Sequence, residues 1–167
     1  MTYTLKNVSL TNGEKVNIVI KERVISSIGA EIEGDLFDCS GLMALPGLVD
    51  LHTHLREPGK EDSETVLSGS QAAALGGFTA VSAMANTSPV ADTAGVVEQV
   101  YRLGKSAGLC DVFPIGAVTV GLEGERLSEI GAMADSEARV RIFSDDGKCV
   151  SDPLVMRRAL EYVKAFG

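Results

Sequence analysis

The chain opens with short segments of β character and continues with longer apolar runs. In residues 1–43, Gly and charged residues separate three short segments rich in Val, Ile and Thr. Such short runs, broken by turn residues, are typical of strands. The segments are 3–10, 16–20 and 24–29, with a turn at Thr11, Asn12 and Gly13 between the first two. The pattern therefore predicts a small β unit over residues 1–43.

From residue 44 onward, apolar runs alternate with helical stretches. The runs are nearly continuous, as expected for strands buried on both faces of a parallel sheet. They are 45–55, 78–86, 111–120 and 140–146. Stretches with helical periodicity follow each run, at 63–75, 93–107, 126–134 and 152–165. The second begins after Asp92 and Thr93 and ends at Gly108, and Pro153 suits the first turn of the fourth. The alternation predicts four βα units.

The number of βα units defines the fold class that we expect. A complete (β/α)₈ barrel takes about 250 residues. We therefore predict an α/β fold in which residues 44–167 form the N-terminal half of a (β/α)₈ TIM-type barrel, ending after the fourth βα unit, preceded by the β unit 1–43. The chain is then expected to be an N-terminal fragment. Its open sheet edges favour broad or aggregating unfolding.

The composition of the chain excludes several classes of protein. The chain is 45% hydrophobic and 23% charged, which is typical of a soluble globular protein. It lacks the roughly 18-residue apolar run of a membrane span and the pattern of a signal peptide, so we expect a cytoplasmic protein. A net charge of −8 argues against nucleic acid and anionic membranes as partners. The three cysteines, without a C-x-x-C pair, argue against disulfides and cysteine zinc sites.

The chain has two histidines, His52 and His54, near the end of the first predicted barrel strand. Alternate strand residues share a face, so His52, His54 and Arg56 should project together. Two imidazoles at a barrel rim could bind zinc, and Arg56 could reach an anionic substrate group. The alternative is that both histidines are partly buried strand residues bonded to backbone carbonyls. Burying these ionisable rings without other partners would carry a desolvation cost. Asp50, on the same face, could orient an imidazole or close the barrel bottom.

Two further segments should reach the same rim. Asp145 and Asp146 lie at the C-terminal end of the fourth predicted strand, and a carboxylate there could complete a metal site. Asp-Asp-Gly alone is more often an ordinary turn. Asn86, at the end of the second predicted strand, could offer a donor and an acceptor to a small polar substrate, although Asn before Thr-Ser-Pro is also common in turns.

The segment LPGLVDLHTHLREPG, residues 45–59, resembles the metal-binding signature of the amidohydrolase superfamily, and specifically of the dihydroorotases. The likeness extends along the whole chain. It includes the N-terminal β unit, the Gly-Gly-Phe-Thr segment at 76–79, the Ala-Asn-Thr segment at 85–87 and the Phe-Ser-Asp-Asp-Gly segment at 143–147.

The resemblance implies a metal site and a substrate site. It implies one or two zinc ions bound by His52 and His54 and bridged by Asp146, with His54, Arg56 and Asn86 binding substrate. The implied reaction is the reversible hydrolysis of L-dihydroorotate to N-carbamoyl-L-aspartate in de novo pyrimidine biosynthesis. The family's two later metal-binding histidines and its proton-shuttling aspartate would lie beyond this chain. We therefore expect no catalytic residue within it and no turnover by it alone.

Three alternatives stay open at this point. The first is another cyclic amidohydrolase, a dihydropyrimidinase, hydantoinase or allantoinase, in which a carboxylated lysine bridges the metals; Lys148 could be imagined in that role. The second is a non-catalytic dihydroorotase-like subunit of an aspartate carbamoyltransferase complex, although such subunits tend to lose metal ligands. The third is a self-contained small metal-binding α/β protein, which would unfold cooperatively. The partners implied are a second copy of the chain or aspartate carbamoyltransferase.

Overall fold

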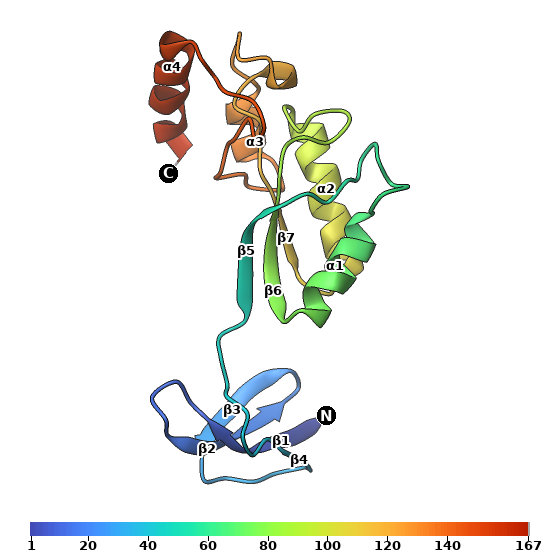
Figure 1. Cartoon of the computed structure of the whole chain (residues 1–167), viewed down its shortest axis with the longest axis vertical. Coiled ribbons are helices and arrows are strands. Elements are labelled where there is room, and N and C mark those ends of the chain that lie inside the picture. The colour runs from blue at the N-terminus through green and yellow to red at the C-terminus, as the bar shows by residue number, and fades with distance from the viewer. Residues whose placement is uncertain (167) are drawn as a thin grey trace. The chain divides into compact units, whose positions relative to one another are not determined.

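The computed structural model describes residues 1–166, which form two compact units. The first unit comprises Met1–Pro46 and the second begins at Gly47. Figure 1 shows the first unit as a small sheet and the second as a sheet with helices. Each unit has its own buried hydrophobic residues, and in the first these are Val8, Val16, Ile18 and Val19.

Four strands make up the first unit, in the order β3-β2-β1-β4. They are β1 (Thr2–Ser9), β2 (Lys15–Lys21), β3 (Val24–Gly29) and β4 (Asp35–Asp38). β2 is antiparallel to both β1 and β3, whereas β4 is parallel to β1. The sequence predicted the first three strands. β4 was not predicted because its four residues, Asp-Leu-Phe-Asp, are all exposed and show no buried alternation.

Three parallel strands form the sheet of the second unit, in the order β5-β6-β7. They are β5 (Leu48–Thr53), β6 (Phe78–Ala83) and β7 (Asp111–Pro114), each shorter than its predicted apolar run. The run 140–146 was wrong as a strand, because only Phe143 forms a bridge, a parallel one to Gly116. A side chain at Gly116 would place its Cβ 2.8 Å from the Phe143 ring, so glycine permits this close approach.

Four helices lie within their predicted segments or one residue beyond. They are α1 (Val66–Leu75), α2 (Ala94–Ala107), α3 (Ile130–Asp135) and α4 (Pro153–Val163), and two 3-10 turns cover Val120–Leu122 and Lys164–Phe166. The predicted end of α2 is confirmed, because Gly108 has the left-handed conformation at φ 62°. The Asp152 carboxylate caps α4 by accepting from the Leu154 N–H at 2.7 Å. None of these helices in residues 1–166 has both the length and the apolar character needed to cross a bilayer.

The sheet of the second unit is covered on one side. α1 and α2 lie on the same side of β5, β6 and β7 (Figure 1). Buried residues between these layers are Leu55, Val66, Val81, Ala83, Val100 and Val112. Apolar residues elsewhere on the strands stay exposed, including Val49 at 57%, Leu51 at 66% and Phe113 at 49%. Together with Ile142 they line one concavity, which we call the open face.

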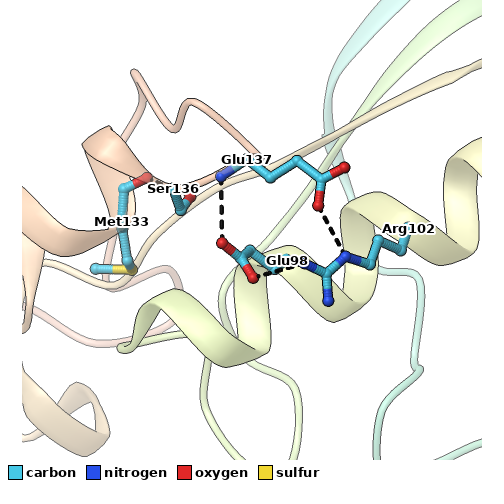
Figure 2. A network of polar contacts seen from close by, with 5 residues as sticks. All are labelled: Glu98, Arg102, Met133, Ser136 and Glu137. Carbon is cyan, nitrogen blue, oxygen red and sulfur yellow. Dashed lines mark hydrogen bonds and ion pairs between the residues drawn. The ribbon is translucent and has the colours of Figure 1, made fainter.

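A polar network joins α2 to the chain that follows α3 (Figure 2). Arg102 contacts Glu98 at 3.0 Å and Glu137 at 2.8 Å, and Glu98 accepts from the Glu137 backbone N–H at 3.2 Å. The hydrogen bond and the attraction from Glu137, with Glu98 adding to it, raise the pKa of Arg102. Water screens these exposed pairs, so they contribute little to stability.

The carboxylate of Asp145 is buried and holds the loop after β7. It accepts from the backbone N–H of Val118 at 2.7 Å and of Thr119 at 3.0 Å, and also from the Thr119 hydroxyl. Its residue is 5% exposed. Charge-assisted bonds to buried donors are among the stronger ones, so this carboxylate ties residue 145 to residues 118 and 119. The acid at 145 therefore has a structural role.

We expect the substitution Asp145→Ala to loosen this loop, because it leaves buried backbone donors without partners. The expected loss is about 2 kcal/mol of local stability, or roughly 30-fold faster amide hydrogen exchange at residues 118 and 119. Mass-spectrometric exchange of the whole chain would measure it. Asp62→Ala, at an exposed acid, is the control and should leave the exchange unchanged. Equal protection in the Asp145 variant would contradict the structural role.

We also expect the open face to bind an apolar dye, because its side chains meet water. Leu51→Ser should lower the fluorescence of bound anilinonaphthalene sulfonate. Leu75→Ser removes a leucine that is 91% exposed but lies outside the open face, and should have little effect. Similar decreases for the two variants would show that the dye does not report this face.

Candidate metal centre

The end of β5 departs from regular strand geometry where the histidines lie. The pairing of β5 with β6 shifts register between Asp50 and Thr53. The Asp50 carboxylate accepts from the backbone N–H of His52 at 3.0 Å. Asp50 thus holds the backbone beside this register shift. From the sequence we had expected it to orient an imidazole or to close the bottom of the barrel. Because β5 ends at Thr53, His54 lies just beyond the strand, and simple alternation does not describe the two rings.

The carboxylate of Asp146 faces both imidazoles. Its Oδ1 lies 3.3 Å from His52 Nε2 and its Oδ2 lies 3.4 Å from His54 Nε2. The two rings are edge to face, with centroids 5.2 Å apart. Their side chains are 56% and 31% exposed, and that of Asp146 is 21% exposed. The two neighbouring histidines and an aspartate that is distant in sequence therefore meet at the carboxyl edge of the sheet.

This group has the chemistry and spacing of a metal site. One ligand atom from each of His52, His54 and Asp146 lies within 4.8 Å of the others. Zinc bonds to nitrogen and oxygen are about 2.0–2.2 Å long, and tetrahedral bonds of that length leave ligand atoms about 3.4 Å apart. The contacts of 3.3 and 3.4 Å, which the two different oxygens of Asp146 make with the two rings, are close to that separation. Two imidazoles and a carboxylate also suit a borderline divalent cation.

Asn86 contacts the second histidine on its other nitrogen. The side-chain Oδ1 of Asn86 lies 3.0 Å from His54 Nδ1. The backbone brings the two residues together, because the Met84 N–H donates to the Thr53 carbonyl at 2.8 Å across the ends of β5 and β6. This contact between Asn86 and His54 was not predicted from the sequence. It could have been predicted, because both residues lie just after neighbouring parallel strands.

Arg56 is half-buried and follows His54 by two residues. Among residues 1–166, its guanidinium makes no hydrogen bond or ion pair with a protein group. The loop that carries it is held to the loop after β6, because the Ser88 N–H donates to the Pro58 carbonyl at 2.9 Å. A Cβ at Gly59, which has φ 104°, would lie 2.1 Å from the Ser88 carbonyl oxygen. These loops can pack this closely only with glycine at position 59.

The two acids at the end of the fourth apolar run, Asp145 and Asp146, therefore have different roles. Asp145 bonds to residues 118 and 119 inside the protein, whereas Asp146 faces the histidines. Lys148 is exposed, and its backbone N–H donates to the Asp145 carbonyl at 2.8 Å in the turn. Of the two carboxylates, the one at 146 is thus the one that faces the His52 and His54 pair.

Known proteins similar in sequence are dihydroorotases. The chain is 66% identical to the dihydroorotase of Leifsonia xyli over 99% of its own length, which is 38% of that protein. It is 60% identical to the dihydroorotase of Streptomyces coelicolor, covering 97% of this chain and 39% of the relative. For the Mycobacterium tuberculosis dihydroorotase the identity is 54%, with 93% and 37% covered. The chain thus spans less than two fifths of these relatives.

Solved structures with similar folds include hydantoinases and dihydropyrimidinases. The L-hydantoinase (dihydropyrimidinase) of Arthrobacter aurescens superposes with a TM-score of 0.74 at 23% identity, over 97% of this chain and 38% of that chain. The dihydropyrimidinase of Brevibacillus agri NCHU1002 gives a TM-score of 0.75 at 18% identity, over 100% and 38%. At these identities the likeness shows an α/β fold shared with the N-terminal portions of both enzymes.

The decisive match is to a family of sequences. Residues 41–165, which include both histidines, Arg56, Asn86 and Asp146, match the family described as Dihydro-orotase-like. This match covers well over half of the chain and agrees with the names of the relatives above. The chain belongs to the dihydro-orotase-like family.

Proposed function

We propose that this chain provides the N-terminal part of a zinc-dependent dihydroorotase, which interconverts L-dihydroorotate and N-carbamoyl-L-aspartate. The observation that carries the proposal is the Asp146 carboxylate facing both imidazoles in a chain of this family. The parallel order β5-β6-β7 and the likeness to hydantoinases support a further proposal, that the second unit is half of a (β/α)₈ barrel.

The proposed metal site uses His52, His54 and Asp146. A zinc ion held there would lower the pKa of a bound water and polarise the amide carbonyl of the substrate. The two imidazoles supply neutral nitrogen ligands, and the Asp146 carboxylate offsets part of the charge of the cation. Asp50 keeps the backbone of His52 in place through its 3.0 Å bond.

The proposed substrate site lies beside the metal site and includes Arg56, Asn86 and His54. Dihydroorotate and N-carbamoyl-L-aspartate both carry a carboxylate, and a guanidinium can bind a carboxylate through two parallel hydrogen bonds. The Arg56 guanidinium has no protein partner among residues 1–166, so it can make such bonds. The amide of Asn86 can donate a further hydrogen bond.

Charge and cysteine chemistry agree with a cytoplasmic location, which we propose with this activity. The three cysteines, Cys39, Cys110 and Cys149, are free. A net charge of −8 suits a small-molecule enzyme without nucleic acid or membrane partners. The role as a non-catalytic scaffold is disfavoured, since His52, His54 and Asp146 have not been lost from this chain.

We expect the chain to bind zinc or cobalt(II) at this site. His52→Ala, His54→Ala and Asp146→Ala should each lower the affinity at least tenfold, because each removes one of three ligands. Calorimetric titration of the whole chain would measure this, and the cobalt spectrum would report the ligand set.

The matched control is Cys149→Ala, which removes an exposed thiol three residues from Asp146. Its affinity should equal that of the unchanged chain. If the thiol variant lost binding while the histidine variants kept it, the metal would be bound elsewhere and the proposed site would be wrong.

Activity can be tested in a chimera in which this chain replaces the corresponding part of the Streptomyces coelicolor dihydroorotase, to which it is 60% identical. We expect the chimera to hydrolyse L-dihydroorotate. Arg56→Met should lower kcat/KM for this substrate roughly 100-fold, because a charge-assisted pair of bonds to the carboxylate is lost.

The control for the chimera is Arg158→Met, at an exposed arginine of α4, which should leave kcat/KM unchanged. A preference of the chimera for hydantoin or dihydrouracil over dihydroorotate would favour another cyclic amidohydrolase. An Arg56 variant with undiminished kcat/KM would remove this arginine from the substrate site.

A further inference from the structure

We propose that Asn86 is a positioning residue for the metal ligand His54, in addition to its role toward substrate. By accepting a hydrogen bond from His54 Nδ1, it holds the ring with Nε2 directed at Asp146. The inference rests on the proposed function in one respect: the cation that Nε2 would bind is the one proposed above.

The two nitrogens of His54 have different neighbours. Nδ1 lies 3.0 Å from Asn86 Oδ1, and Nε2 lies 3.4 Å from Asp146 Oδ2. A carbonyl oxygen only accepts, so Nδ1 must carry the proton for this contact to be a hydrogen bond. The neutral ring then has its lone pair on Nε2, which is the nitrogen beside the carboxylate. A metal ligand needs that lone pair.

His52 lacks the equivalent support. Its Nε2 also faces Asp146, at 3.3 Å, but no side chain in residues 1–166 accepts from its Nδ1. Its side chain is 56% exposed, against 31% for His54. The two ligands thus differ in how firmly the protein orients them, and His52 serves as an internal reference for His54.

The backbone around Asn86 is well fixed. Met84 and Ala85 are buried, at 5% and 0% exposure. The Met84 N–H donates to the Thr53 carbonyl at 2.8 Å, and the Ala91 N–H donates to the Ala85 carbonyl at 3.0 Å. The loop that carries Asn86 is therefore tied to the strand that precedes His54, so Oδ1 can act as a preplaced acceptor.

The orientation of the Asn86 amide has a consequence for ligand binding. With Oδ1 accepting from His54, the Nδ2 group remains as a donor, and a donor suits a carboxylate. One side chain can thus contact the metal ligand and the substrate carboxylate through different atoms. The variants Asn86→Leu and Asn86→Asp separate the two contacts, because leucine offers neither and aspartate keeps only the acceptor.

Nuclear magnetic resonance of the ¹⁵N-histidine-labelled whole chain tests the orientation without metal. The spectra are recorded at about pH 8.5, where a free imidazole is neutral. We expect His54, unlike His52, to carry its proton on Nδ1, and Asn86→Leu to abolish that difference. Asn86→Asp should preserve it. A proton on Nε2 of His54 in the unchanged chain would overturn the inference.

Zinc titration provides the second readout. Loss of a hydrogen bond that orients a ligand typically lowers metal affinity 10- to 100-fold, so we expect this decrease for Asn86→Leu and less than a threefold decrease for Asn86→Asp. Thr87→Ala changes the next residue of the loop, whose hydroxyl donates to the Pro89 carbonyl, and is the control for loop disturbance. It should retain full affinity.

The outcomes distinguish the two proposals. If the unchanged chain binds zinc through His52, His54 and Asp146 but Asn86→Leu binds it equally well, Asn86 does not position His54 and the proposed function stands. If the unchanged chain binds no zinc while His54 still carries its proton on Nδ1, Asn86 orients the His54 ring but the proposed metal site, and with it the role of His54 as a ligand, is wrong. In the chimera, Asn86→Asp should raise KM for dihydroorotate while its zinc content is retained.

Discussion

Parallel strand pairing is the constraint on which the candidate site depends. β5, β6 and β7 run in the same direction, and the bridge between Gly116 and Phe143 continues that direction. The residues that follow each strand or bridge therefore come out at one edge of the sheet. This is why position 146 meets positions 52 and 54, although about ninety residues separate them in the sequence.

Hydrogen bonds then fix the positions of the site residues at this edge of the sheet. Asp50 holds the backbone of His52, and Asp145 holds the loop after β7. Asn86 contacts His54 on the side away from Asp146. Each bond uses a polar side chain where the regular ladder is interrupted or has ended, so that backbone or ring donors would otherwise lack partners. The site is therefore held by groups that lie beside the three proposed ligands.

The second unit combines this ordered edge with an uncovered surface. One side of the sheet packs against α1 and α2, while Val49, Leu51 and Phe113 stay exposed on the open face. Burial of apolar surface is the main favourable contribution to folding, so an uncovered face leaves part of that contribution unused. The order of the edge comes instead from local hydrogen bonds and from the buried residues on the helical side.

Apolar periodicity alone identified most elements of the fold. Continuous runs gave the positions of β5, β6 and β7, and helical spacing gave α1, α2, α3 and α4, with capping residues adding to the prediction for α2 and α4. β4 was not predicted because its four exposed residues show no alternation of buried and exposed positions. The run 140–146 is apolar enough for a strand, yet it reaches its neighbour through one bridge. Propensity reports what a segment can form, whereas partners decide how much of it pairs.

The sequence by itself determined which residue types gather at the edge: two imidazoles, a guanidinium, an amide and a pair of acids, each at or near the end of an apolar run. Only the tertiary structure decided their separate roles. In the structure, the Asp145 side chain is buried and the Asp146 side chain faces the histidines. The Asn86 side chain contacts His54. The physical reason is that residue spacing fixes where a side chain leaves the backbone, while its partner depends on loops packed across neighbouring strands.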